Sequence, residues 1–251
     1  MTQEEFKNLE RLFHLVNPYE KFQYKKYKHD VTGWTHTTAT FEALIKIVQP
    51  TLIIEAGSWK GKSASVMAKY AKELDHFCGI ACVDTWLGAR EFFTHQRSVI
   101  DNSWFNDFVS NPDFHKERYD ELKLKNGYPS VYYSFLANMM HEGIQDMVIP
   151  FPMPSTMGAR YFKAADVVSE LIFIDASHEE EDVYNDLQAY NTLLAPDGVM
   201  FGDDIWINDV RKAVERFCLS KYIKPVFTDA YWVISKNQHV LKQYEELVKT
   251  L

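Results

Sequence analysis

Two short apolar segments joined by a charged helical segment constrain the fold of this chain more than any other feature. Residues 171–174 and 199–201 are the apolar segments, and each has the length of a buried strand. Residues 179–194 have a helical pattern, and Pro-Asp-Gly at 196–198 breaks the chain before the second segment. This order predicts two parallel strands connected by a helix, with both strands ending at the same edge of a sheet.

Acidic residues follow both predicted strands. Asp175 closes the first strand, and Asp203 and Asp204 close the second. Because the carboxyl ends of neighbouring parallel strands meet at one crevice, we expect three carboxylates to converge there. A divalent cation with oxygen ligands relieves such repulsion. His178, three residues beyond Asp175, is predicted to lie at the mouth of this crevice as a candidate base.

The same residues also have a purely structural interpretation. Ser177 and Glu180 have the spacing of a capping box, so Asp175 and His178 would then only belong to a helix start. The two aspartates after the second strand fit a turn or a helix cap. Their occurrence together at two neighbouring strand ends favours a binding site.

Composition limits the class of protein. The chain has 251 residues, 46% of them hydrophobic, which is enough for one substantial core. Its net charge of -8 argues against a large nucleic-acid footprint, and no apolar run reaches the roughly 18 residues of a membrane helix. An odd number of cysteines without metal-binding spacing and an acidic, amphipathic amino-terminal segment predict a cytoplasmic protein with reduced thiols.

A cradle for a nucleoside is predicted nearer the amino terminus. Residues 52–55 form a short apolar strand, and residues 56–63 (AGSWKGKS), here called the glycine turn, precede a predicted helix at 64–74. A strand, a glycine-containing turn and a helix bring backbone N–H groups close to a ligand. Residues 76–83 form the next strand. Asp84 then stands where a carboxylate accepts hydrogen bonds from ribose hydroxyls.

Two ligands compete for this cradle. The glycine turn matches a phosphate loop if Ala56 replaces its first glycine, and Asp175 would then hold magnesium. Glu55, directly before the turn, would repel a triphosphate but attract an amino group. An amine site, a glycine turn and a ribose site describe a nucleoside with an amino-acid tail, which S-adenosylmethionine fits better than ATP.

The remaining elements predict a three-layer α/β/α domain. Helices are expected at 3–16, 38–48, 131–141, 156–164, 208–218 and 238–249, a strand at 146–149, and a hairpin from 222–227 and 230–235. About seven strands alternate with helices until the last pair, which implies a mostly parallel sheet with one antiparallel edge strand. A proline-rich loop at 150–155 would line an adenine through Ser155 or serve only as a rigid turn.

Two regions depart from this alternation. Residues 1–50 are predicted to form an amino-terminal helical arm or lid before a domain at 51–251. Residues 85–130 form an aromatic-rich insertion with a charged helix at 114–125, which either walls in an acceptor or serves in packing or dimer formation. Residues 19–34 contain both lysines and aromatic residues, a combination that can bind a nucleic-acid strand. Because the chain as a whole is acidic, we favour a surface arm or lid with solvated lysines.

The order of these motifs resembles the S-adenosylmethionine-dependent methyltransferases of the Rossmann-like class. The resemblance covers about residues 51–235 and rests on the glycine turn, on Asp84, and on the stretches IDASHEEEDVYNDL and LLAPDGVMFGDD. It is closest to metal-dependent, macrocin-type O-methyltransferases that act on sugar hydroxyls, with catechol enzymes as more distant relatives. Trp59 is a departure, since many methyltransferases have glycine there.

The resemblance implies three groups of site residues. It implies His178 as the general base, with Asp175 beside it. It implies a divalent cation, expected to be Mg²⁺, on Asp175, Asp203 and Asp204. It implies methyl-donor contacts at Glu55, Gly57, Ser58, Gly61, Ser63, Asp84, Ser155 and Asp175.

The implied reaction is methyl transfer to a hydroxyl of a glycan or glycoside. A cation on the hydroxyl oxygen would lower its pKa, and His178 would take its proton. Chelation favours a vicinal diol as the acceptor, with a catechol-like phenol as the alternative. An ATPase or kinase with a phosphate loop and a catalytically silent binding module are the rival classes. No nucleic-acid or membrane partner is expected, and homo-oligomer formation stays open.

Overall fold

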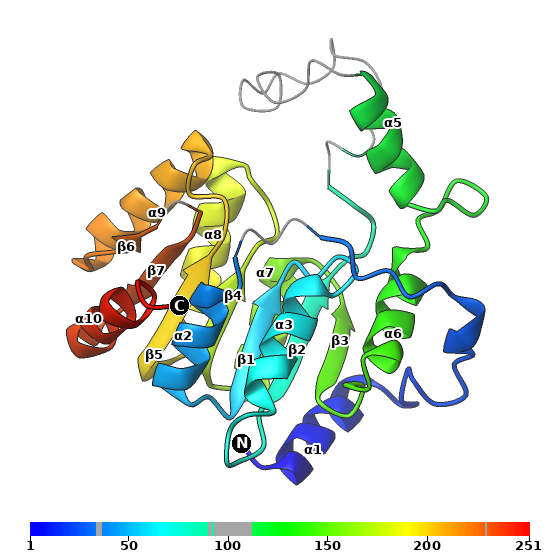
Figure 1. Cartoon of the computed structure of the whole chain (residues 1–251), viewed down its shortest axis with the longest axis horizontal. Helices are drawn as coiled ribbons and strands as arrows, with labels where there is room; N and C mark the ends of the chain where they lie inside the picture. Colours follow the sequence, from blue (N-terminus) through cyan, green and yellow to red (C-terminus); the bar gives the residue numbers. More distant parts are fainter. Residues whose placement is uncertain (34–36, 90–91, 93–111, 229) are drawn as a thin grey trace.

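The computed structural model describes residues 1–33, 37–89, 92, 112–228 and 230–251. At its centre is a seven-stranded sheet in the order β3-β2-β1-β4-β5-β7-β6 (Figure 1). The strands are β1 (Leu52–Ala56), β2 (Gly79–Asp84), β3 (Val148–Pro152), β4 (Ser169–Ile174), β5 (Leu194–Gly202), β6 (Val226–Phe227) and β7 (Trp232–Ser235). Strands β1 to β5 pair in parallel, while β7 pairs antiparallel with both β5 and β6. The mostly parallel sheet is therefore confirmed, with the two-residue β6 closing the edge outside β7.

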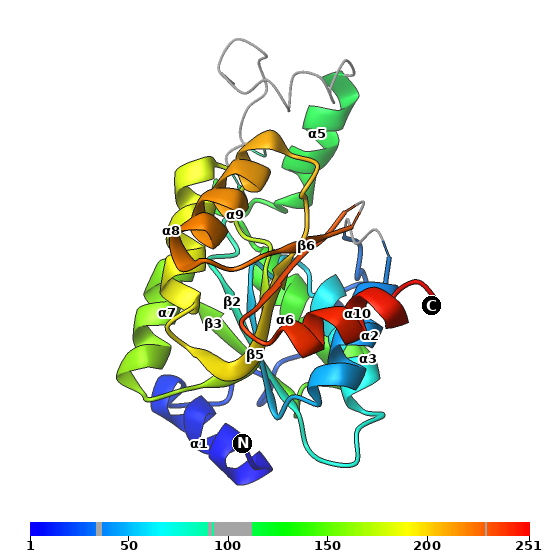
Figure 2. The same cartoon turned by 90° about the vertical axis from the view of Figure 1, so that its left-hand side faces the viewer.

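Helices cover both faces of the sheet and form the three layers that the sequence predicts (Figures 1 and 2). One face buries side chains of α2 (Ala39–Val48), α3 (Lys62–Ala71), α6 (Val131–His141) and α10 (Gln238–Leu247). The other face buries side chains of α1 (Gln3–Phe13), α7 (Ser155–Ala164), α8 (Glu180–Tyr190) and α9 (Asn208–Lys221). Successive strand residues alternate between these two clusters, as Ile53 and Ile54 of β1 do, because side chains point to opposite faces of a sheet.

Two strands are longer than the sequence predicts. β3 continues through Pro150 to Pro152, which were expected to form a loop; an edge strand tolerates prolines because one of its sides needs no N–H donors. β5 begins at Leu194 instead of after the Pro-Asp-Gly break. Leu194 pairs with Ser169 and the next pairing joins residues 199 and 171, so the extra residues of β5 form an irregularity within the strand.

The amino-terminal segment packs against the domain. Phe6 and Leu9 of α1 are buried in the core, and Phe6 lies so close to Gly79 that a Cβ there would stand 2.3 Å from its ring. Further along, the 3-10 helix η1 (Tyr24–Lys26) contacts α6. The division of the chain at residue 50 stays a prediction, but α1 and α2 both contribute to the core.

The aromatic insertion is described only at its two ends. Trp86 and Phe92 are buried at its start, and α5 (Pro112–Glu121) lies near its end, away from the sheet (Figure 1). The insertion's Phe93, Trp104, Phe105 and Phe108 lie outside the described residues. None of the helices in the described part of the chain is long and apolar enough to cross a membrane. The three cysteines are free and buried.

The strand order reverses between β1 and β4. From β1 the chain proceeds to β2 and β3 on one side, and from β4 to β5 on the other. Such a reversal opens a crevice at the carboxyl ends of the two strands, where ligands bind in this class of sheet. The N–H of Asp175 donates to the carbonyl of Ala56 at 2.8 Å, which joins the two strand ends. The glycine turn and the acidic strand end therefore lie side by side.

Candidate active site

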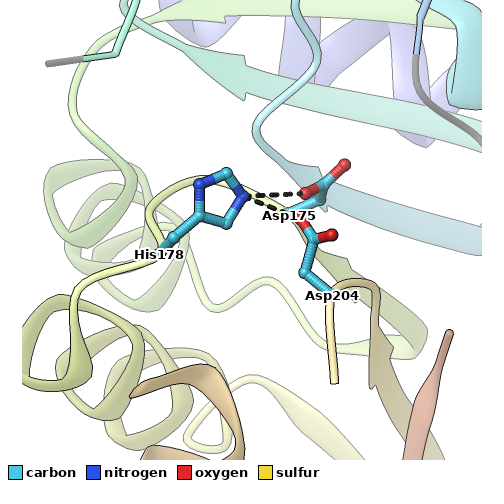
Figure 3. Close-up of side chains that lie close together, drawn as sticks. All are labelled: Asp175, His178 and Asp204. Atoms are coloured by element: carbon cyan, nitrogen blue, oxygen red, sulfur yellow. Dashed lines mark ion pairs between the residues drawn. The ribbon is translucent and has the colours of Figure 1, made fainter. Parts of the chain in front are cut away.

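Asp175, His178 and Asp204 point toward one another at the carboxyl ends of β4 and β5 (Figure 3). His178 Nε2 lies 2.8 Å from Asp204 Oδ2 and 4.0 Å from Asp175 Oδ1. One potential ligand atom from each residue lies within 4.8 Å of the others, a spacing that a single cation can bridge. We call these three residues the Asp-His cluster.

Asp203 is placed differently from its neighbour. Its side chain is buried, and its Oδ1 accepts the N–H of Asp204 at 2.7 Å. Its carboxylate still lies close enough to Asp175 for its charge to act on that group. Of the three acids predicted to share an ion, the structure brings Asp175 and Asp204 together with His178, while Asp203 supports the backbone of Asp204, whose φ of 61 lies in the left-handed region.

Electrostatic repulsion is concentrated on Asp175. Burial of the carboxyl group and the charges of Asp204 and Asp203 raise its pKa well above the usual range, and His178 opposes the rise. The Asp175 side chain is 36% exposed, so solvent screens part of this effect. Repulsion from the neighbouring acids is the contribution that the geometry supports most directly, and a bound cation would relieve it.

The capping-box interpretation of this region is wrong. α8 begins at Glu180, and Glu179 at its N-cap makes no side-chain cap hydrogen bond. Ser177 Oγ instead accepts the N–H of Glu179 at 3.3 Å and donates to Asp182 at 3.1 Å. The helix therefore starts later than the capping box requires. Asp175 and His178 lie in the loop before α8 and are not part of its first turn.

Gly57 is the tightest point of the glycine turn. Its φ of 89 lies in the left-handed region, and a Cβ at this position would stand 1.9 Å from the carbonyl oxygen of Asp175. Only glycine fits this approach of two backbones. The same close contact brings the Asp-His cluster next to the turn.

Asp84 fixes the middle of the glycine turn. Its Oδ2 accepts the N–H groups of Ser58 at 2.9 Å and Trp59 at 2.8 Å, and its Oδ1 accepts that of Trp86 at 2.7 Å. Burial raises the pKa of Asp84, and these backbone hydrogen bonds oppose the rise. The backbone N–H of Thr85 acts on the same carboxylate, so Asp84 holds the turn through several main-chain donors at once.

Trp59 adopts a backbone conformation that normally favours glycine. Its φ of 46 lies in the left-handed region, as does the φ of 85 at Gly61, the N-cap of α3. The Trp86 indole N–H donates to the Trp59 carbonyl at 2.7 Å, and the Trp59 ring packs on Phe92 at 4.7 Å between centroids. These contacts offset the strain of a side chain in this conformation.

Glu55 and Ser63 lie beneath the turn. Glu55 is 0% exposed and accepts hydrogen bonds from Ser63 Oγ and, at 3.1 Å, from Cys82 Sγ. Burial raises its pKa, and hydrogen bonds from nearby side chains oppose the rise. Glu55 was predicted to contact the amino group of the donor, but neither of its carboxylate oxygens is exposed. The alternation of side chains along β1 places Glu55 on the face of the sheet that α3 covers. Both residues instead anchor the first turn of α3.

One polar atom of the glycine turn is left for a ligand. Ser58 Oγ is buried and has no hydrogen bond of acceptable geometry within the described part of the chain. It lies close enough to the Glu55 carboxyl group to lower the pKa of that group. The glycine cradle, this hydroxyl and the carboxylate of Asp84 at the end of β2 fit a nucleoside with an amino-acid tail.

Ser155, the predicted adenine contact, is held by α8. Its hydroxyl donates to Asp186 Oδ1 at 2.5 Å, and its carbonyl accepts the Tyr190 hydroxyl at 2.9 Å. The sequence reasoning missed Asp186, although a signal was present. Residues 183, 186, 187 and 190 have the spacing of one buried helix face, which places Asp186 in the interior.

Asp186 makes stability depend on pH. Burial raises its pKa to about 7, with the Ser155 hydrogen bond opposing, whereas an unfolded carboxyl titrates near ~3.9. Stability therefore falls as pH rises between about 4 and 7, because only the unfolded chain ionises freely there, and levels off above the folded pKa. Asp186→Asn is expected to be more stable than wild type by about 4 kcal/mol at pH ~8 and equally stable at pH ~4. Urea unfolding at both pH values measures this, and equal stability at the higher pH would contradict it.

Comparison with known proteins agrees with this arrangement. Residues 54–205 match a family model described as a methyltransferase domain. The match covers more than half of the chain and includes both the glycine turn and the Asp-His cluster. The chain belongs to this family of methyltransferase domains, which decides against the phosphate-loop ATPase or kinase. No curated protein matches the sequence.

Solved structures share the fold. The O-methyltransferase from Bacillus cereus in complex with SAH is 13% identical, with a TM-score of 0.53 over 93% of this chain and 90% of that one. The O-methyltransferase TomG from Streptomyces achromogenes in complex with SAM is 12% identical, with a TM-score of 0.54 over 94% and 98%. The TDP-rhamnose 3'-O-methyltransferase of calicheamicin biosynthesis is 14% identical, with a TM-score of 0.50 over 80% and 79%. These likenesses confirm the predicted Rossmann-like methyltransferase fold.

Proposed function

We propose that the chain is an S-adenosylmethionine-dependent O-methyltransferase that uses a divalent cation to methylate a sugar hydroxyl in a glycan or glycoside. The observation that carries the proposal is the convergence of Asp175, His178 and Asp204 beside the glycine turn. Relatives of the same fold are described as binding SAM or SAH, and one as acting on TDP-rhamnose, which supports the donor and the acceptor class.

The donor would bind at the glycine turn. Gly57 lets the chain approach closely, Ser58 Oγ is a buried hydroxyl without a partner among the described residues, and Asp84 holds the turn at the end of β2. These groups suit the amino-acid tail and the ribose of S-adenosylmethionine. The turn adjoins Asp175, so a donor in it would present its methyl group toward the Asp-His cluster.

Asp175 and Asp204 would supply the oxygen ligands that Mg²⁺ prefers. A cation held there would lower the pKa of the acceptor hydroxyl and would neutralise the repulsion between the two acids. Two adjacent acceptor oxygens fit one ion better than a single hydroxyl does. We therefore expect a vicinal diol.

His178 is the proton acceptor in this proposal. Its Nε2–H donates to Asp204 Oδ2 at 2.8 Å, which holds the ring in orientation. In the neutral ring Nδ1 then carries the lone pair that would accept the proton. The acceptor hydroxyl loses its proton to the ring as its oxygen forms a bond to the methyl carbon. The carbon–sulfur bond breaks at the same time, and its electron pair leaves with the now neutral thioether.

A transfer assay with labelled S-adenosylmethionine tests the proposal. Glycosides and catechols are screened as acceptors with Mg²⁺ or with a chelator. We expect transfer to a vicinal-diol glycoside that falls at least ~100-fold with chelator and returns with Mg²⁺. Asp197→Asn removes an exposed acid far along β5 from the cluster, and this control variant should remain active.

The other outcomes of the screen each have a defined meaning. Transfer undiminished by the chelator would remove the metal role. A preference for catechols would favour the phenol alternative, for which the half-exposed Trp206, two residues after Asp204, offers a stacking surface. Donor binding without transfer to any acceptor would favour a silent binding module.

A further inference from the structure

Lys60 carries a buried charge inside the glycine turn that none of the roles above uses. Its side chain is 0% exposed, whereas lysine is almost never fully buried unless it is paired. It stands between Trp59 and Gly61, which both have left-handed backbones. Trp59 is strained in this conformation because it has a Cβ, and such strain persists only where the surrounding structure holds it.

The ammonium group of Lys60 has acceptors in two distant segments of the chain. Its Nζ donates to Asp30 Oδ2 at 2.8 Å and Thr32 Oγ1 at 3.1 Å, both before α2, and to Glu121 at the end of α5. A lysine has three N–H donors, so these three acceptors satisfy it completely. The buried charge is therefore compensated only while both segments lie against the turn.

Asn138 of α6 ties the same segments together through the backbone. It is buried, and its side-chain nitrogen donates to the carbonyls of Asp30 at 2.7 Å and Lys60 at 2.8 Å. Its Oδ1 accepts the N–H of Asp30 at 2.9 Å. The glycine turn, the segment around Asp30 and α6 thus share one hydrogen-bond network, whose members strengthen one another.

The charges of this network balance. Lys123 Nζ lies 3.3 Å from Asp30 Oδ2, so Asp30 and Glu121 face two ammonium groups. Partial burial acts to raise the pKa of Asp30, but the hydrogen bonds with Lys60 and Thr32 and the charges of both lysines outweigh it and lower that pKa below the usual range. Without the Lys60 charge, the ion pairs that join the turn to Asp30 and Glu121 would be lost, while Lys123 would stay beside Asp30.

We propose that Lys60 is a positioning residue for the methyl donor, which holds the glycine turn in its binding geometry through Asp30 and Glu121. Asp84 fixes the amides of the turn from one side, and Lys60 fixes the turn from the other. The inference rests on the donor part of the proposed function. It does not depend on the cation or on the sugar acceptor.

Calorimetric binding of S-adenosylhomocysteine to the full chain, without metal or acceptor, tests this inference. Lys60→Met keeps the length of the side chain and removes its charge, and we expect Kd to rise ~10-fold or more. The KM for the donor should rise in parallel, while kcat at saturating donor changes less than ~3-fold. Lys60→Arg keeps the charge and should recover most of the affinity. Lys69→Met, which removes an exposed lysine of α3, is the matched control and should bind like wild type.

The contrary results are distinct. A folded Lys60→Met variant with affinity within ~2-fold of wild type, an equal loss in Lys69→Met, or a loss confined to kcat would overturn the inference. If Lys60→Met does not fold, Glu121→Gln decides, because its side chain is 41% exposed and the core stays intact. It should weaken binding ~3-fold, and unchanged affinity would overturn the inference. Failure of wild type to bind would instead refute the donor assignment itself.

Discussion

Replacing His178 with alanine is expected to lower kcat by roughly 100- to 10,000-fold while leaving donor affinity unchanged. The ring faces the carboxylates of Asp175 and Asp204, on the far side of Asp175 from the close approach of Gly57 to its carbonyl oxygen. Its loss therefore removes the proton acceptor without disturbing the donor site. Steady-state kinetics at saturating donor, together with calorimetry of S-adenosylhomocysteine binding, measure the two effects separately.

His239→Ala is the control for this substitution, because His239 is an exposed histidine in the first turn of α10. It should leave both kcat and donor affinity unchanged. A His178→Ala variant with full activity would remove the base from the mechanism. A variant that loses donor affinity and kcat together would show that His178 acts on the fold of the site rather than on the proton.

Gly57→Ala is expected to lower the free energy of unfolding by at least about 3 kcal/mol and to abolish donor binding. The new Cβ would stand 1.9 Å from the Asp175 carbonyl oxygen and 2.4 Å from its carbon, and a backbone group cannot move aside as a flexible side chain can. The φ of 89 adds strain for any residue with a Cβ. Urea unfolding and donor calorimetry measure both effects.

Gly143→Ala separates the clash from the strain. Gly143 also has a left-handed φ, of 63, but a Cβ there would meet no atom within 4 Å. This control should cost only about 1 kcal/mol and leave donor binding intact. Equal destabilisation by the two substitutions would show that the close approach of β1 and β4 does not define the site.

The sequence predicted those parts of the molecule that follow from local pattern. The apolar runs at 171–174 and 199–201 became neighbouring parallel strands, so Asp175 and Asp204 were correctly expected at one sheet edge. The period of two along a strand also contained information that the prediction did not use. Glu55 shares a face with Ile53, which implies the burial under a helix that the structure shows.

Long-range pairing is the part that local pattern does not contain. Lys60 meets Asp30 and Glu121, which are 30 and 61 residues away, and no spacing rule joins such positions. Likewise, whether Asp203 joins Asp204 in the Asp-His cluster depends on the backbone conformation at the end of β5, where the Asp204 φ of 61 turns the chain. Strands and the residues at their ends are therefore easier to predict from sequence than the turn conformations that determine where those end residues point.

The position of a bound cation tests the central claim most directly. Crystals grown with S-adenosylhomocysteine and Mn²⁺ as a substitute for Mg²⁺ would reveal the ion by its anomalous scattering. The account predicts one peak between Asp175 and Asp204, within roughly 2.5 Å of an oxygen of each and beside the glycine turn. An anomalous peak coordinated by other residues would contradict the account. So would the absence of any peak in crystals in which S-adenosylhomocysteine occupies the glycine turn.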